Sequence, residues 1–101
     1  DITERRAAVM ESGLAYLRPG IFMNLDDGAD PYDTRGFHAF IDDSFAQFRN
    51  AGARALLIDL RDNPGGHNAF SDHLIAWFAT RPFRFCSRFA MRASTQAVEA
   101  N

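Results

Sequence analysis

The feature that most constrains the fold is an apolar run, Ala53–Leu60, that ends abruptly in Arg61-Asp62-Asn63-Pro64-Gly65-Gly66. A short, nearly continuous apolar run is typical of a strand buried on both faces in a parallel or mixed sheet. Helical patterns lie on both sides of it, and a helix that precedes such a strand predicts α/β layering. The 101 residues are enough for one domain, so we expect a single unit over 1–101.

The helix before this strand is predicted over 34–51. Thr34 is placed to cap its start and Gly52 to end it. Apolar residues recur at helical spacing and predict one buried side: Phe37, Phe40, Ile41, Phe45 and Phe48. A second helix is expected from His67 or Asn68 to about Thr80, where Arg81-Pro82 stops it. Its buried side is predicted to carry Phe70, Leu74, Ile75, Trp77 and Phe78.

Three further strands are predicted from the pattern of the remaining residues. Arg6–Met10 and Leu14–Arg18 resemble two short strands about a turn. Phe83–Met91 alternates strictly and predicts a strand with one buried side. The acidic stretch Asn24–Asp33 is interpreted as a loop and not as a calcium site, because it lacks the alternating ligands and the final Glu of an EF-hand.

Charge and composition exclude several classes of function. The formal net charge is −2, so nothing global favours nucleic acid or an anionic membrane, and no apolar run is long enough to span a bilayer. Arg84, Arg88 and Arg92 lie on one strand face, but without the interleaved aromatics of an RNA-binding patch. All 11 basic residues are Arg, so Lys-based catalysis is absent from these residues. The single Cys86 permits no internal disulfide, and we expect no metal and no cofactor.

The loop that joins the strand to the second helix carries the candidate chemistry. Gly65 and Gly66 can adopt conformations closed to other residues, so their N–H groups can point outward. Two donors at a helix N-terminus suit an anion or a developing oxyanion. A plain Pro-Gly turn explains the same residues, and the phosphate-binding motifs are absent.

The segment Leu57-Ile58-Asp59-Leu60-Arg61-Asp62-Asn63-Pro64-Gly65-Gly66 resembles the signature strand and loop of the S41 peptidases, the tail-specific or C-terminal-processing serine proteases. Two further segments are similar to that family: Gly13–Gly20 to the strand that opens its catalytic core, and Phe70–Phe78 to the helix after the glycines. The resemblance covers roughly residues 12 to 92. It implies an α/β fold related to ClpP and crotonase, of which this chain would hold a β-β-α core, about half of a catalytic domain.

The resemblance implies peptide-bond hydrolysis near protein C-termini by a Ser nucleophile with a Lys base. It assigns Gly65 or Gly66 to the oxyanion hole, and we give Arg61 and Asn63 a loop-positioning role. The family's Ser and Lys lie beyond the glycines, and neither has a counterpart in this chain, so we expect these 101 residues alone to be inactive. His67 and Ser71 are four apart on the predicted helix, but no nucleophile elbow surrounds Ser71.

The alternative is a non-catalytic module of the same fold that binds a lipophilic ligand or a peptide, with some of the ten Phe residues lining its pocket. The resemblance implies a peptide or a protein C-terminus as partner and, since bacterial members usually work outside the cytoplasm, a periplasmic or secreted location. A half-domain would leave apolar faces open to water, so we expect self-association.

Overall fold

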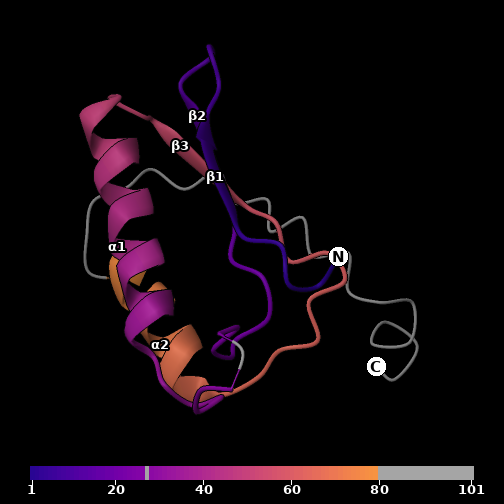
Figure 1. Cartoon of the computed structure of the whole chain (residues 1–101). Coiled ribbons are helices and arrows are strands. Elements are labelled where there is room, and N and C mark those ends of the chain that lie inside the picture. Colours follow the sequence, from indigo (N-terminus) through magenta and orange to yellow (C-terminus); the bar gives the residue numbers. More distant parts are fainter. Residues whose placement is uncertain (27, 80–101) are drawn as a thin grey trace.

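The computed structural model describes residues 1–26 and 28–79, which form a small mixed α/β fold. The elements are, in order, β1 (Arg6–Val9), β2 (Leu14–Arg18), α1 (Arg35–Asn50), β3 (Ala55–Ile58) and α2 (Asn68–Ala79). Figure 1 shows the three-stranded sheet with both helices on one side of it. The predicted strand Phe83–Met91, with Cys86 and the arginines of that segment, lies outside the described residues.

The predicted hairpin at the N-terminus is confirmed. β1 and β2 pair antiparallel, with Val9 opposite Ala15. The turn between them is closed by two backbone bonds: the Met10 N–H donates to the Leu14 carbonyl (2.8 Å) and the Gly13 N–H to the Met10 carbonyl (2.9 Å). Gly13 has φ +84°, a conformation that favours glycine and explains the residue at this turn.

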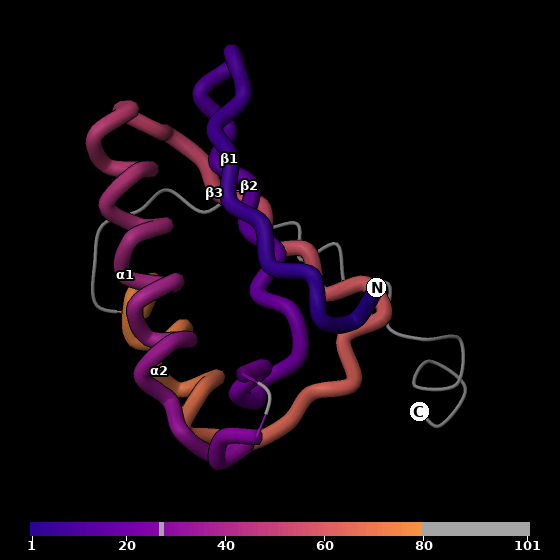
Figure 2. Tube along the Cα trace, viewed as in Figure 1, coloured from indigo at the N-terminus to yellow at the C-terminus, as the bar shows by residue number. Residues whose placement is uncertain are grey.

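β2 and β3 pair in parallel, and this pairing positions the candidate site. Leu14 lies opposite Ala55, and Leu17 opposite Ile58. The Asp59 N–H extends the ladder by donating to the Leu17 carbonyl (2.7 Å). The carboxyl ends of two parallel strands therefore meet at one edge of the sheet, which is where open α/β sheets bind ligands. Figures 1 and 2 place the first residues of the chain beside the loop that leaves β3 at this edge.

The predicted stripe of α1 is buried against the sheet and against α2. Phe37, Ile41, Phe45 and Phe48 are buried, and Phe40 packs beside them half-buried. At about 2 kcal/mol for each large apolar side chain, this stripe is a principal source of stability.

The end of α1 follows from Gly52, as predicted. Gly52 has φ +68°, and its N–H donates to the Arg49 carbonyl (3.0 Å), while the Ala53 N–H donates to the Phe48 carbonyl (2.9 Å). This pair of bonds is a Schellman motif. The start differs from the prediction, because the Thr34 side chain makes no capping bond. Instead, Asp33 Oδ1 accepts from the Arg35 N–H (3.1 Å).

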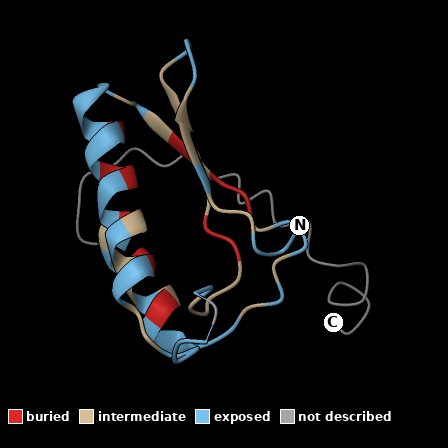
Figure 3. Cartoon of the chain, in the orientation of Figure 1, coloured by how far each residue is buried: buried red, intermediate tan, exposed pale blue. Residues whose placement is uncertain are grey.

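The expectation that the central apolar strand is buried on both faces is wrong for β3. Leu56 and Ile58 are buried, whereas Ala55 and Leu57 are only half-buried. The reason is visible in Figure 3: both helices cover the same face of the sheet. Within the described part of the chain no element covers the other face of β3.

α2 packs on α1 through fewer side chains than predicted. Phe70 and Leu74 are buried, but Ile75 is 46% exposed. A helix turns about 100° per residue, which places Ile75 about 140° from Phe70 and off the buried side. The Trp77 ring stacks on Phe45 at 5.0 Å between centroids.

A polar contact also joins the two helices. Asp42 Oδ1 accepts from Trp77 Nε1 and lies at hydrogen-bond distance from His73 Nε2, both at 2.7 Å. The His73 ring stacks on His38 of α1, with 3.8 Å between centroids. The bonds from Trp77 and His73 lower the pKa of the Asp42 carboxyl against the opposing effect of its desolvation.

Candidate functional site

The loop after β3 begins at a buried carboxylate, Asp59, which is 3% exposed. Arg61 donates to it three times: from its backbone N–H to Oδ1 (3.1 Å), from Nε to Oδ1 (3.0 Å) and from Nη2 to Oδ2 (2.9 Å). The Tyr16 hydroxyl donates to Oδ2 (2.5 Å), and Arg18 Nη1 lies 3.8 Å from the same oxygen. A buried acid at the end of β3 is thus paired with two residues of β2 and with one of the loop itself.

These contacts shift the pKa values of Asp59 and Tyr16 in opposite directions. The bonds from Arg61 hold the pKa of Asp59 well below its usual range, with Tyr16 adding to the effect against desolvation. Burial, and then the bond to Asp59, raise the pKa of Tyr16. Asp59 is therefore a fixed anion at neutral pH. Arg61, which we predicted to position the loop, bonds to this carboxylate two residues before it in the chain.

Asn63 ties the middle of the loop to the segment after β2. Its Nδ2 donates to the Gly20 carbonyl (2.8 Å), and its Oδ1 accepts from the Gly65 N–H (2.8 Å). The Asn63 N–H donates to the Leu60 carbonyl (3.0 Å). Each polar group of the amide is used, so the Gly65 N–H is already occupied inside the loop.

The next residue, Gly66, lies against Phe22 in a single parallel bridge. The Phe22 N–H donates to the Gly65 carbonyl (2.9 Å), and the His67 N–H donates to the Phe22 carbonyl (3.0 Å). The Gly66 N–H itself has no hydrogen-bond acceptor among residues 1–26 and 28–79, and the residue is exposed. Within the described residues the Gly66 N–H is therefore a free backbone donor, and the peptide groups on both sides of it are paired.

His67 and Ser71 are not brought together by a hydrogen bond. His67 precedes α2, and its Nδ1 accepts from the Ala69 N–H (3.1 Å), which caps the helix. Ser71 Oγ donates to the Asn68 carbonyl (3.3 Å). Both side chains thus act at the first turn of α2.

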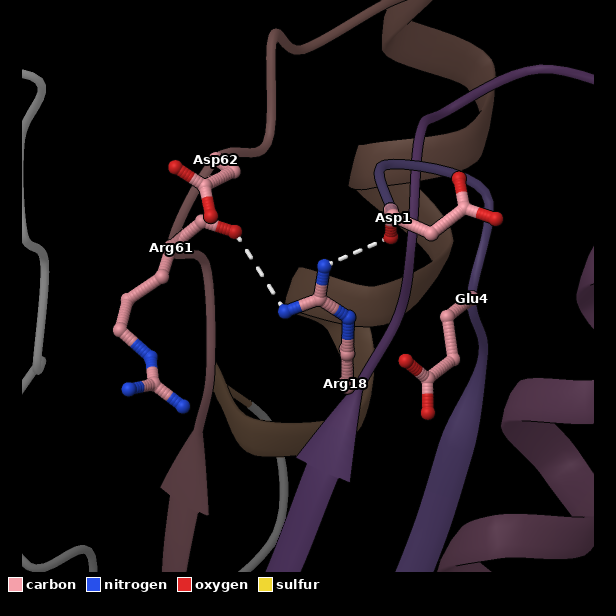
Figure 4. A pocket seen from close by; sticks show the side chains of 5 residues that line it. All are labelled: Asp1, Glu4, Arg18, Arg61 and Asp62. Atoms are coloured by element: carbon pink, nitrogen blue, oxygen red, sulfur yellow. Dashed lines mark hydrogen bonds between the residues drawn. The ribbon is translucent and has the colours of Figure 1, made fainter.

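A polar pocket of about 300 Å³ opens at the carboxyl ends of β2 and β3. Its lining is charged and comes from the N-terminal segment, β2 and the loop: Asp1, Glu4, Arg18, Arg61 and Asp62. In Figure 4 the Arg18 guanidinium lies at its centre and donates to the carbonyls of Asp1 (2.7 Å) and Arg61 (3.5 Å). Arg18 thus bridges the chain start and the loop.

Sequence reasoning singled out Arg61, Asn63, Gly65 and Gly66, and the structure gathers them in one loop. It missed the partners that hold this loop: Asp59, Tyr16, Arg18, Gly20 and Phe22. The sequence did contain one indication of this role for Asp59, because it is the only acid in the apolar run Ala53–Leu60. The Phe22 contact carries no sequence signal, since it depends on the path of the chain after β2.

No protein-family model, no curated protein and no solved structure matches this chain. In the described residues, no group of three or more His, Cys, Asp or Glu side chains is placed to hold a metal ion. Neither described helix is long and apolar enough to cross a membrane.

Proposed function

We propose that this chain is part of the catalytic core of a serine peptidase that resembles the tail-specific proteases, and that its glycine loop supplies a donor to the oxyanion hole. The observation that carries the proposal is the N–H of the exposed residue Gly66, which lies between paired neighbours and has no acceptor in the described residues. The role goes to Gly66 and not to Gly65, because the Gly65 N–H donates to Asn63.

The chemical contribution of such a donor follows from electrostatics. When a nucleophile attacks a peptide carbonyl, negative charge develops on the carbonyl oxygen. An N–H fixed in advance stabilises that charge without reorganisation, and loss of one such donor costs roughly 10²–10³ in kcat. Asn63, Arg61 and Asp59 would serve this role indirectly, because they hold the backbone that presents Gly66.

The remaining catalytic groups belong to polypeptide outside these residues. A Ser nucleophile and a Lys base, in the fold related to ClpP and crotonase, would complete the core. The sequence contains no Lys, so the base cannot come from this chain. The substrate would be a peptide near a protein C-terminus, in the periplasm or outside the cell.

The first test is to determine the coding sequence on both sides of these residues and to express the protein it encodes. We expect a Ser in a strand-to-helix turn after the glycine loop and a Lys beyond it. Cleavage of an unstructured peptide by that protein, abolished by a Ser→Ala change at this position, would support the proposal. A protein that lacks the pair and cleaves no peptide would contradict it.

The lipophilic-ligand alternative requires phenylalanines that line a pocket. Phe37, Phe45, Phe48 and Phe70 are instead buried in the core, where their rings contact one another in edge-to-face pairs. These side chains are therefore explained by packing alone, and they give the alternative no support.

A further inference from the structure

An exposed aromatic ring lies beside the glycine loop. Tyr32 is 60% exposed, and its ring meets the His67 ring edge-on, with 5.3 Å between centroids. The loop that carries Tyr32 is held by its own bonds: the Tyr32 N–H donates to Asp30 Oδ1 (2.9 Å), and the Asn24 N–H donates to the Pro31 carbonyl (2.8 Å). The Tyr32 ring is therefore exposed to water at a defined position. It contacts His67, which lies 35 positions away in the sequence.

The His67 ring is also fixed, and its proton can be assigned. Nδ1 accepts from the Ala69 N–H, so the neutral ring carries its hydrogen on Nε2. That Nε2–H has no acceptor among residues 1–26 and 28–79, and neither has the N–H of the preceding Gly66. Two consecutive residues, Gly66 and His67, therefore each carry a donor without an acceptor in the described residues, and the ring of the second one contacts the exposed Tyr32.

We propose that Gly66, His67 and Tyr32 form a subsite for a peptide residue with an aromatic or large aliphatic side chain. The backbone carbonyl of that residue accepts from the Gly66 N–H, and its side chain packs on the Tyr32 ring. An aromatic pair gains about 0.5–1.5 kcal/mol beyond the area it buries, which favours such residues over glycine. The inference rests on the proposed function, since it assumes a peptide substrate, and it names the residue type that this substrate carries.

The test is a titration of the 101-residue chain with two probes, N-acetyl-phenylalaninamide and N-acetylglycinamide, followed by the backbone amide signals in NMR spectra. We expect saturable shifts of the Gly66 and His67 amides and about tenfold tighter binding of the phenylalanine probe. Tyr32→Ala should abolish that preference, and Tyr32→Phe should retain it. Ile75→Ala, which removes an exposed apolar side chain from α2, is the matched control and should leave the preference unchanged.

A second readout does not depend on any variant: ring protons of the bound phenylalanine probe should show nuclear Overhauser effects to the Tyr32 ring. Absence of saturable shifts at Gly66 and His67, equal affinity for the two probes, or a preference that survives Tyr32→Ala would each overturn the subsite. If the proposed function is wrong, the complete protein will cleave no peptide. That experiment is separate from the titration, so the two failures can be told apart.

Discussion

Gly66 lies so close to Phe22 that a Cβ on residue 66 would stand 2.3 Å from the Phe22 carbonyl oxygen. Real side chains do not approach a backbone oxygen this closely, and Gly66 also has φ +138°. Glycine at this position is therefore required by the fold, whatever the loop does in function. The same contact fixes the direction of the free N–H.

Gly66→Ala should destabilise the protein strongly. The strained φ and the overlap with a backbone atom each cost on the order of 1–3 kcal/mol. Gly65→Ala is the matched control, because it shares a positive φ (+95°) but its Cβ would meet nothing within 4 Å. Urea unfolding should show the larger loss for Gly66→Ala, and equal losses would show that the approach of Phe22 is not maintained in solution.

Asn63 should control the Gly65 amide and leave the Gly66 amide untouched. Asn63→Ala removes the acceptor of the Gly65 N–H, so amide hydrogen exchange at Gly65 should become fast, with a loss of about 1–2 kcal/mol in stability. Asn63→Asp keeps the acceptor for the Gly65 N–H and replaces the donor to Gly20 by a second acceptor, so Gly65 should stay protected although stability falls. Gly66 should exchange rapidly in all three proteins. Strong protection of Gly66 would mean that its N–H has an acceptor and is not free.

Asp59 should make stability depend on pH in the acid range. Its pKa is lowered in the folded protein, so the folded state binds the proton less tightly than the unfolded chain. The stabilisation is therefore present above the unfolded value of about 3.9 and is lost as the pH falls through the folded value. Urea midpoints between pH 6 and pH 2.5 should fall more steeply for the wild type than for Asp59→Asn.

The Asp59→Asn variant should retain some acid sensitivity from two other carboxyls. Arg35 lowers the pKa of Asp33 to about 2, and the pKa of Asp42 is also lowered. Both remain in Asp59→Asn, so the difference between the two proteins isolates Asp59. At neutral pH this variant should lose roughly 1–3 kcal/mol, as expected when a buried acceptor of several donors is weakened. Parallel pH curves for the two proteins would contradict the assigned network.

Core packing predicts different losses of stability for two apolar residues, one in each helix, that helical periodicity had predicted to be buried. Phe45 is fully buried, so Phe45→Ala should cost about 3–5 kcal/mol. Ile75 is 46% exposed, so Ile75→Ala should change stability by no more than about 0.5 kcal/mol. Thermal or urea unfolding of both variants measures the difference. A large loss for Ile75→Ala would place that side chain in an interface.

The sequence was sufficient where local chemistry decides the structure. Periodicity predicted α1 to within one residue at each end, and Gly52 marked its stop, because a positive φ after a helix is a local requirement. The hairpin of β1 and β2 was predicted for the same reason, since alternation and a turn glycine are read from neighbouring residues.

The sequence was insufficient where distant segments meet. The half-exposed face of β3 depends on both helices lying on one side of the sheet, which no pattern within the strand encodes. The Asp59 network joins residues 43 positions apart, and the Phe22 contact to Gly66 joins residues 44 apart. The choice of Gly66 over Gly65 as the free donor follows from these contacts and could not be made from the glycine pair alone.

The most direct test of the central claim is to replace the amide of Gly66 by an ester in the protein encoded by the complete reading frame. This change removes the N–H and adds no atom toward Phe22. An ester at Gly52, whose N–H bonds to Arg49 at the end of α1, is the control. We predict a fall in kcat/KM for peptide cleavage of about 10²–10³ for Gly66 and little change for Gly52. Unchanged cleavage by the Gly66 ester would show that this N–H does not stabilise the oxyanion.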